Sequence, residues 1–285
     1  MQEVTVRVPA STSNLGPGFD CLGVALRIYN SVTMARGGKH SSTGVVDETA
    51  ARFFKQSGAK SFSFHCVIGQ GVPRSRGLGS SGTVRTGVLL ALNRLAGNPL
   101  DRLAIFRLCA ELEGHPDNAA PSIFGGFTVV RGDSVQRFNV STRLRFVLLL
   151  PDLEIRTPSA RKVLPSQIDR TKAVESCAHA CAITAAFASR DYSELRGAFT
   201  DHFHQPFRQK LIPFLPRVVG AAEKAGALGA FLSGSGSAIA AITLQSAKKI
   251  GAAMKDACRL KNSRIVITSA DNHGARVLRS PITDH

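Results

Sequence analysis

The sequence predicts a protein that combines α-helices and β-strands (α+β), and three observations support this class. Alternating or continuous apolar residues indicate strands at 4–9, 62–68, 126–130, 145–150 and 264–268. Apolar residues at helical spacing indicate helices at 47–58, 84–95, 98–114, 173–189, 218–225 and 247–260. Glycine-rich loops connect the two kinds of element, and the one at 233–237 joins two apolar segments as a β-hairpin.

In the first half, each element has a local signal. The N-terminal strand alternates valine with polar residues from Val4 to Val8, and the helix at 47–58 ends at Gly58. The strand at 62–68 leads into a glycine-serine loop, and the helix after that loop places apolar residues on one face from 84 to 95. We place the cap of the next helix at Asn98, because Pro99 fits the first helical position.

In the second half, the segment 145–150 is a continuous apolar run, which is typical of a central strand. The helix at 173–189 is rich in alanine, which predicts close packing. It carries Cys177 and Cys181 one turn apart. The six cysteines show no zinc-site spacing, so we expect all six to pack in the core. The hairpin at 229–242, the helix at 247–260 and a last strand complete the chain.

Length and composition limit the classes of protein. The chain has 285 residues, 44% hydrophobic and 20% charged, which suits one large or two ordinary globular domains. We divide it at residue 150, into 1–150 and 151–285, and expect the halves to fold together. Its apolar runs are shorter than the roughly 20 residues that span a bilayer. The chain starts directly with a strand, so we expect no signal peptide, no membrane partner and a cytoplasmic location.

The net charge of +16 suggests either a nucleic-acid surface or a cleft that attracts anionic substrates. The basic residues are spread along the chain, and it has only two tyrosines and no tryptophan for base stacking. This pattern argues against a dedicated nucleic-acid partner.

The stretch Val72 to Thr83 has the layout of an anion site, in which a strand, a glycine-serine loop and a helix follow one another. Glycines let backbone N–H groups approach a phosphate, and the helix start adds unpaired donors and a partial positive charge. Ser80 and Ser81 offer hydroxyls to a phosphate oxygen or to a magnesium ion. An ordinary tight turn with an N-cap serine is the alternative. The loop is not a Walker motif, because no Lys-Ser/Thr pair follows its last glycine.

The order Pro-x-x-x-Gly-Leu-Gly-Ser-Ser in this loop resembles the phosphate loop of the GHMP kinases, named for galactokinase, homoserine kinase, mevalonate kinase and phosphomevalonate kinase. Other segments resemble further motifs of the family and favour its homoserine kinases. They are the glycine-rich loop 10–20, Glu-Gly-His-Pro-Asp-Asn at 113–118, Thr-x-x-x-Arg at 157–161, the segment 201–208 and the glycine-serine turn 233–237.

The resemblance implies a GHMP kinase fold, with an N-terminal domain like ribosomal protein S5 domain 2 and a C-terminal ferredoxin-like domain. The active site is expected between them. It also implies an ATP- and Mg²⁺-dependent kinase that phosphorylates the hydroxyl of L-homoserine, a step of threonine biosynthesis.

The resemblance also implies roles for individual residues. The nucleotide phosphates are expected at Pro73, Arg76, Gly77, Leu78, Gly79, Ser80, Ser81, Gly82 and Thr83, with Gly234 and Gly236 from the third motif. Mg²⁺ is expected at Ser81 and Glu113, with Glu111 as the alternative carboxylate. The acceptor is expected at Asn14, Asp20, His115, Asn118, Thr157, Arg161 and Arg208. Here Arg161 and Arg208 clamp its carboxylate, Asn14 and Asp20 take its ammonium, and Asn118 and Arg161 serve catalysis.

Some points stay open in the sequence. Asn14 and Asp20 could instead cap the turn that carries them. Asn118 cannot accept a proton, so we expect no aspartate-type general base and a hydroxyl proton that leaves to a phosphate oxygen or water. Other functions to weigh are another GHMP kinase with a mevalonate-like substrate, a non-catalytic ATP-binding relative and a nucleic-acid-binding module. The region that usually supplies the adenine pocket is short, so no adenine contact is assigned, and a homodimer is left open.

Overall fold

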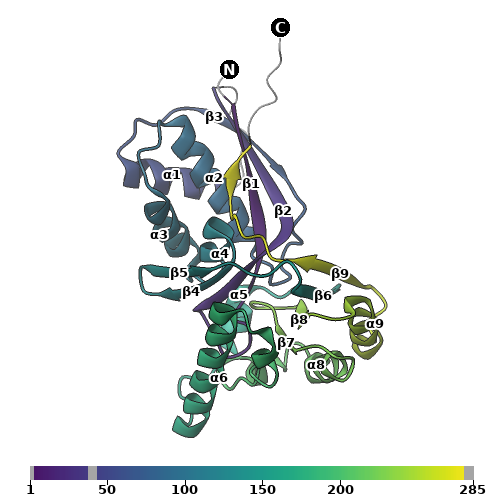
Figure 1. Cartoon of the computed structure of the whole chain (residues 1–285). Helices are drawn as coiled ribbons and strands as arrows, with labels where there is room; N and C mark the ends of the chain where they lie inside the picture. The colour runs from purple at the N-terminus through teal and green to yellow at the C-terminus, as the bar shows by residue number, and fades with distance from the viewer. Residues whose placement is uncertain (1–2, 38–43, 279–285) are drawn as a thin grey trace.

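The computed structural model describes residues 3–37 and 44–278, and the upper part of Figure 1 is built on a six-stranded antiparallel sheet. Its order is β10-β1-β2-β4-β5, with β3 also pairing with β2. The strands are β1 (Glu3–Ser13), β2 (Leu22–Arg36), β3 (Phe64–Gly69), β4 (Phe127–Arg131), β5 (Ser134–Phe138) and β10 (Arg276–Val277). The helices of this part are α1 (Gly44–Ser57), α2 (Ser80–Leu95), α3 (Arg102–Glu113) and α4 (Ala119–Phe124).

The lower part of Figure 1 contains a four-stranded antiparallel sheet of order β7-β8-β6-β9. Its strands are β6 (Arg145–Pro151), β7 (Gly229–Leu232), β8 (Ile239–Thr243) and β9 (Ser263–Ser269). The helices are α5 (Thr157–Lys162), α6 (Arg170–Ser189), the 3₁₀ turn η1 (Tyr192–Leu195), α7 (Gln205–Arg208), α8 (Leu215–Lys224) and α9 (Ala247–Cys258). The predictions of a central strand at 145–150 and of a hairpin formed by β7 and β8 are confirmed.

Two helix starts, those of α2 and α3, differ from the sequence-based expectation by four residues. Helix α2 begins at Ser80, one turn before the expected Val84, because Gly79 takes a left-handed conformation (φ +66°) and caps it. Helix α3 begins at Arg102, and its cap is Asp101, whose carboxylate accepts a hydrogen bond from the Ala104 N–H at 2.7 Å. The prediction of Asn98 as the cap was therefore wrong. The expected end of α1 at Gly58 is confirmed by its φ of +65°.

The prediction that α6 is closely packed was also wrong. Its buried residues are Ser176, Ile183, Ala186 and Phe187, and Val174 on its other face is 63% exposed. Cys177 and Cys181 are exposed with that face, so core packing holds for Cys109 and Cys258 but not for all six thiols. Alanine satisfies helix propensity on an exposed surface as well as in a core, which is why composition did not separate the two cases.

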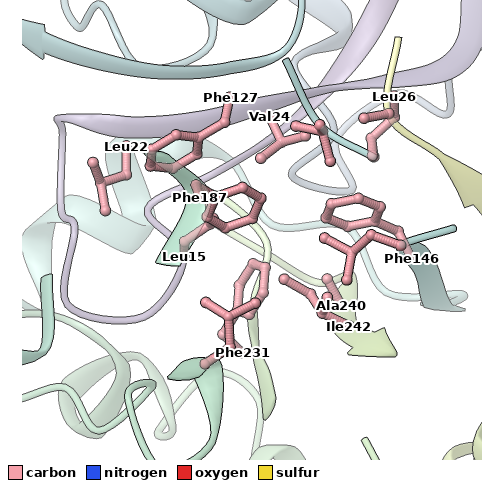
Figure 2. Packing of buried hydrophobic residues seen from close by; sticks show 14 of the residues in the cluster. Leu15, Leu22, Val24, Leu26, Phe127, Phe146, Phe187, Phe231, Ala240 and Ile242 are labelled. Atoms are coloured by element: carbon pink, nitrogen blue, oxygen red, sulfur yellow. The ribbon is translucent and has the colours of Figure 1, made fainter. Parts of the chain in front are cut away.

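A single hydrophobic cluster joins the two sheets, as expected for halves that fold together (Figure 2). It contains β2 and β4 residues of the first sheet together with β6 and β8 residues of the second, namely Leu22, Val24, Leu26, Phe127, Phe146, Ala240 and Ile242. Phe127 stacks on Phe187 of α6 at a centroid distance of 4.2 Å and an interplanar angle of 9°. Such a stack contributes about 0.5–1.5 kcal/mol beyond the area it buries.

The chain also returns to its start, because β10 pairs antiparallel with β1. The first sheet therefore takes strands from both sides of residue 150, and the two ends of the described chain lie together at the top of Figure 1. The division at residue 150 stays a prediction. Within the described residues, no helix is both long and apolar enough to cross a membrane.

Candidate active site

The glycine-serine loop and the start of α2 line a pocket of about 330 Å³ between the two halves. Gly77 and Gly79 have φ angles of +71° and +66°, which an L-residue rarely adopts, and these conformations bring the backbone to the first turn of α2. The pocket is closed by residues of the central motif 113–118, of α5 and of the turn 233–237, including Glu113, His115, Asn118, Thr157 and Ser235. The N-terminus of α2 therefore lines the pocket, and the first N–H groups of a helix have no partner within the helix, which favours binding of an anion.

The third glycine-rich motif, the turn 233–237, lies against this loop. The Ser233 hydroxyl donates to the Gly77 carbonyl at 2.7 Å, and the Ala238 N–H donates to the Arg76 carbonyl at 3.1 Å. A Cβ atom on Gly77 would lie 2.0 Å from the Ser233 carbonyl oxygen. Gly234 donates to the Ser13 carbonyl at 3.1 Å, so this motif also holds the N-terminal loop. The turn 233–237 therefore holds the phosphate loop and the N-terminal loop together.

One hydroxyl and one carboxylate meet at the α2 end of the pocket. The Ser81 hydroxyl donates to Glu113 Oε1 at 2.7 Å, and Arg85 Nε donates to the same oxygen at 2.7 Å. The Glu113 side chain is 9% exposed. Glu111, the alternative ligand, forms an ion pair with Arg52 and is 59% exposed. The Ser81–Glu113 pair fits Mg²⁺, which takes one or two protein oxygens and completes its shell with water and phosphate.

The central motif places an ion pair beside the pocket. His115 Nδ1 and Asp117 Oδ1 are 2.9 Å apart, and the Asn118 amide donates to the same oxygen at 3.4 Å. Burial alone would raise the pKa of Asp117, but the hydrogen bond and charge of His115 and the charge of Arg161 hold that pKa below its ordinary value. Burial likewise opposes the charge on His115, yet Asp117 and Glu113 raise the pKa of His115 above its ordinary value.

The side-chain amide oxygen Oδ1 of Asn118 accepts a hydrogen bond from the Ser11 hydroxyl at 2.8 Å. Asn118 lines the pocket, whereas Asp117 is 2% exposed and does not. An amide, rather than an aspartate carboxylate, therefore lines the pocket.

The N-terminal loop brings Asp20 to α5. Arg161 forms a two-pronged ion pair with Asp20, with NH1–Oδ2 and NH2–Oδ1 distances of 3.0 and 2.7 Å. Asn14 accepts the Asp20 N–H at 3.0 Å and donates to the Gly234 carbonyl at 3.1 Å. Both ends of the Asn14 amide are thus held by backbone groups, as the turn-capping alternative predicts. Asn14, Leu15 and Asp20 all have positive φ, a costly conformation that clusters at functional sites.

Arg161 and Arg208 converge on one ring. Their guanidinium carbons lie 5.5 and 5.3 Å from the centroid of Phe19. Arg208 is 1% exposed and donates to the carbonyls of Ala160 and Gly234 at 3.3 and 2.9 Å. Burial, with the nearby charge of Arg161, lowers the pKa of Arg208 to about 10. Arg161 is the more accessible of the two, with 37% of its side chain exposed.

His204 contacts Arg208, Phe19 and the backbone of the N-terminal loop. Its Nε2 lies 2.8 Å from the Gly16 carbonyl oxygen, its Nδ1 lies 3.2 Å from Arg208 NH1, and its ring stacks on Phe19. Complete burial lowers the pKa of His204 to about 4, although the charge of Asp201, whose carboxylate lies 3.4 Å from Nε2, acts in the opposite direction; the charge of Arg208 lowers it further. The imidazole is therefore neutral at neutral pH, with Nε2 as donor and Nδ1 as acceptor.

A second pocket of about 320 Å³ adjoins the first across Ser75, Ser80 and Ser81. Its walls are the apolar side chains of Val45, Ile68 and Val84, together with Arg74. An apolar pocket that borders a phosphate loop suits a flat heterocycle.

The side chains of several predicted phosphate residues are engaged by other parts of the protein. Leu78 is buried in the shared core, and the Thr83 hydroxyl is held by Asn30 and by the Ser80 carbonyl. The guanidinium of Arg76 pairs with Asp152 and Glu154, at 3.0 and 3.5 Å, in a neighbouring hollow that Pro73 also lines. These residues contribute backbone and shape to the loop in place of side-chain contacts.

Sequence reasoning missed three contributors. Arg85 anchors Glu113, and its signal was a charged residue on the otherwise buried face of α2, four positions after Ser81. Phe19 lies against the guanidinium groups of both arginines, and its position next to Asp20 in the glycine-rich loop was the only hint. The apolar pocket joins residues from α1, β3 and α2, which no local pattern connects.

Comparisons with known proteins agree with this geometry. Residues 44–126 match the GHMP kinases N terminal domain, and residues 183–260 match the GHMP kinases C terminal family. The chain is 39% identical to a homoserine kinase of Synechocystis over 264 residues, which covers 85% of this chain and 86% of that protein. It is 36% identical to a homoserine kinase of Trichormus variabilis over 300 residues, which covers 96% and 99%.

Solved structures give the same result. The crystal structure of a homoserine kinase from Cytophaga hutchinsonii has a TM-score of 0.87, 28% identity and coverage of 98% of both chains. A mevalonate kinase structure has a TM-score of 0.70 at 14% identity, covers 94% of this chain and 99% of that one, and shares the fold alone.

Proposed function

The chain belongs to the GHMP kinases and, among them, to the homoserine kinase family, and from this premise we propose that it transfers the γ-phosphoryl group of ATP to the hydroxyl of L-homoserine. The observation that carries the proposal is the shared pocket, in which the start of α2 faces Glu113, His115, Asn118 and Thr157. The helix N-terminus suits phosphates, and the polar side chains that face it suit an acceptor with a hydroxyl group.

Phosphoryl transfer needs positioning and charge neutralisation more than covalent chemistry. The backbone from Gly77 to Ser81 supplies N–H groups to the phosphates, and the apolar pocket of Val45, Ile68 and Val84 takes the adenine. Ser81 and Glu113 hold Mg²⁺, which neutralises phosphate charge when it is bound.

The acceptor is oriented by groups from both halves. Arg161 binds the carboxylate and Asp20 the ammonium, while the buried Arg208, whose guanidinium also lies against Phe19, adds positive charge for the carboxylate. Asn118 and His115 hold the hydroxyl end of the acceptor. Because Asn118 cannot accept a proton, the hydroxyl proton leaves to a phosphate oxygen or to water. We place the reaction in the cytoplasm, as the sequence predicts.

Turnover of purified protein with Mg²⁺-ATP, followed as ADP release, tests the function. L-homoserine should give product, whereas mevalonate and an acceptor-free control should not. Preference for mevalonate would favour another GHMP activity, and ATP binding without turnover would favour a non-catalytic relative. Salt-dependent RNA binding without kinase activity would favour the nucleic-acid module.

A further inference from the structure

A further concave region, which we call the arginine hollow, lies outside the candidate active site. Its volume is about 760 Å³, and it shares no lining residue with the pocket at the start of α2 or with the apolar pocket beside it. Its lining comes from the segments 139–143 and 190–193, from Leu244, from Asn272 and His273, and from Arg27 of β2. A hollow of this size suits a small organic ligand.

Strand β8 separates the arginine hollow from the phosphate loop. The turn 233–237, which lies against the phosphate loop, precedes β8, and Leu244 follows the last residue of that strand. The five residues of β8 extend over about 17 Å, at about 3.4 Å per residue. A ligand in the arginine hollow therefore does not overlap with a nucleotide at the phosphate loop.

Side-chain hydrogen bonds fix the walls of the arginine hollow. The side chain of Asn272 donates to the Val140 carbonyl and accepts the Val140 N–H, each at 2.8 Å. The hydroxyl of Tyr192 accepts the Ser141 N–H at 2.9 Å, and the Tyr192 ring is held edge-on against Phe187 of α6. Three of the lining segments are thus tied to one another, so the hollow is preformed.

The charge in the arginine hollow is unbalanced. Three arginines line it, and all three are exposed to solvent: Arg27, Arg143 and Arg190. In the part of the chain that the structure describes, none of their guanidinium groups pairs with a carboxylate. The carboxylate of Asp191, which also lines the hollow, instead accepts hydrogen bonds from the N–H and the hydroxyl of Ser193. With His273 neutral, three cations and one anion leave a formal charge of +2.

A phosphate monoester matches these groups in charge and in shape. Its charge at neutral pH approaches −2, and guanidinium groups donate paired N–H bonds to phosphate oxygens. An organic part can pack on Leu244, which is 42% exposed, at the edge of the hollow. A carboxylate with a single charge would leave one positive charge unmatched. The concave shape favours a small ligand over a nucleic-acid strand, which needs an extended basic groove.

We propose that the arginine hollow is a second anion site, which binds a small organic phosphate monoester through Arg27, Arg143 and Arg190. This inference goes beyond the proposed function and does not depend on it. The site is separate from the one that takes the ATP phosphates, and a protein that holds both ligands is expected.

Isothermal titration calorimetry with phenyl phosphate tests the proposal. The protein is first saturated with Mg²⁺-ADP, which fills the phosphate loop. We expect one phenyl phosphate to bind per chain with a Kd on the order of 1 mM or below. Benzenesulfonate, which has a similar ring but a single charge, should bind about tenfold more weakly.

Two variants remove charge from the hollow, and a third is the matched control. Arg143→Gln and Arg190→Gly should each weaken phenyl phosphate binding about tenfold. Arg190 ends α6 with a φ of +62°, and Arg259, outside the hollow, ends α9 with a φ of +59°. Glycine takes this backbone without strain, so both Arg190→Gly and the control Arg259→Gly should fold. Arg259→Gly should leave the affinity unchanged.

No binding of phenyl phosphate up to about 10 mM overturns the proposal. So does an affinity that Arg143→Gln and Arg190→Gly leave unchanged, or one that falls equally in Arg259→Gly, since general surface charge would then explain it. A short single-stranded RNA that binds more tightly than phenyl phosphate, and that loses affinity in Arg143→Gln, overturns the small-molecule ligand. The kinase assignment stands in each of these cases, because ADP release with L-homoserine tests it separately.

Discussion

Replacing Gly77 by alanine tests whether the third motif fixes the phosphate loop. The new Cβ would lie 2.0 Å from the Ser233 carbonyl oxygen and 2.8 Å from the Gly236 nitrogen, and both are backbone atoms that cannot rotate away. The left-handed backbone, φ +71°, costs a non-glycine residue about 1–2 kcal/mol. Separating the loop from Ser233 also removes a hydrogen bond of 2.7 Å, worth about 1 kcal/mol. We expect the free energy of unfolding to fall by about 2–3 kcal/mol.

Gly97→Ala is the matched control, because Gly97 has a similar φ of +88° but no atom within 4 Å of a Cβ. This control should lower the free energy of unfolding by only about 1–2 kcal/mol, which is the cost of a left-handed backbone at a non-glycine residue. Urea unfolding, followed by circular dichroism, compares the two variants. A displaced loop should also lower kcat/KM for ATP by about 10²-fold in Gly77→Ala, with no such effect in Gly97→Ala. Equal unfolding energies and equal ATP kinetics for both variants would refute the close-approach argument.

Three further predictions concern the site. Glu113→Gln should raise the Mg²⁺ concentration for half-maximal turnover roughly tenfold, since an amide binds a hard cation less well than a carboxylate, and an unchanged Mg²⁺ titration would remove Glu113 from the metal site. Asn118→Ala should lower kcat by misplacing the hydroxyl, and the pH–rate profile should show no acidic limb from this site; a carboxylate limb that disappears in Asp117→Asn would contradict the absence of an aspartate base. The pKa of His204 is about 4 in the folded protein against 6.5 ordinarily, so the unfolded chain binds a proton at this histidine more readily than the folded protein does. The free energy of unfolding is therefore at its full value above about pH 6.5 and decreases as the pH falls to about 4. The loss is on the order of 3 kcal/mol. When the free energy of unfolding in urea is plotted against pH, the slope over this range should be shallower for His204→Gln than for the wild type. Identical slopes would contradict the lowered pKa of His204.

The sequence alone determined the features that depend on neighbouring residues. The glycine spacing from Gly77 to Gly82 predicts a loop whose backbone N–H groups can approach an anion just ahead of a helix, because glycine has no Cβ to keep the backbone away. Apolar runs identified the central strand at 145–150 and the hairpin after 229, since burial on both faces removes polar residues from a strand. The motif order was also enough to predict the family, with the ATP-dependent kinase activity that it implies.

Tertiary structure decided which side chains meet. Thr157, Arg161 and Arg208 are more than 130 residues from Asp20, and only the folded chain shows that Asp20 pairs with Arg161 while Arg208 is held by backbone carbonyls. Glu113 and Glu111 both lie on the last turn of α3, but only Glu113 lines the pocket. Their side chains leave the helix in different directions, and the elements that pack against α3 determine which of them faces the pocket. The exposure of α6 follows the same reason: alanine-rich sequence specifies a helix, but the neighbouring elements determine which of its faces is covered.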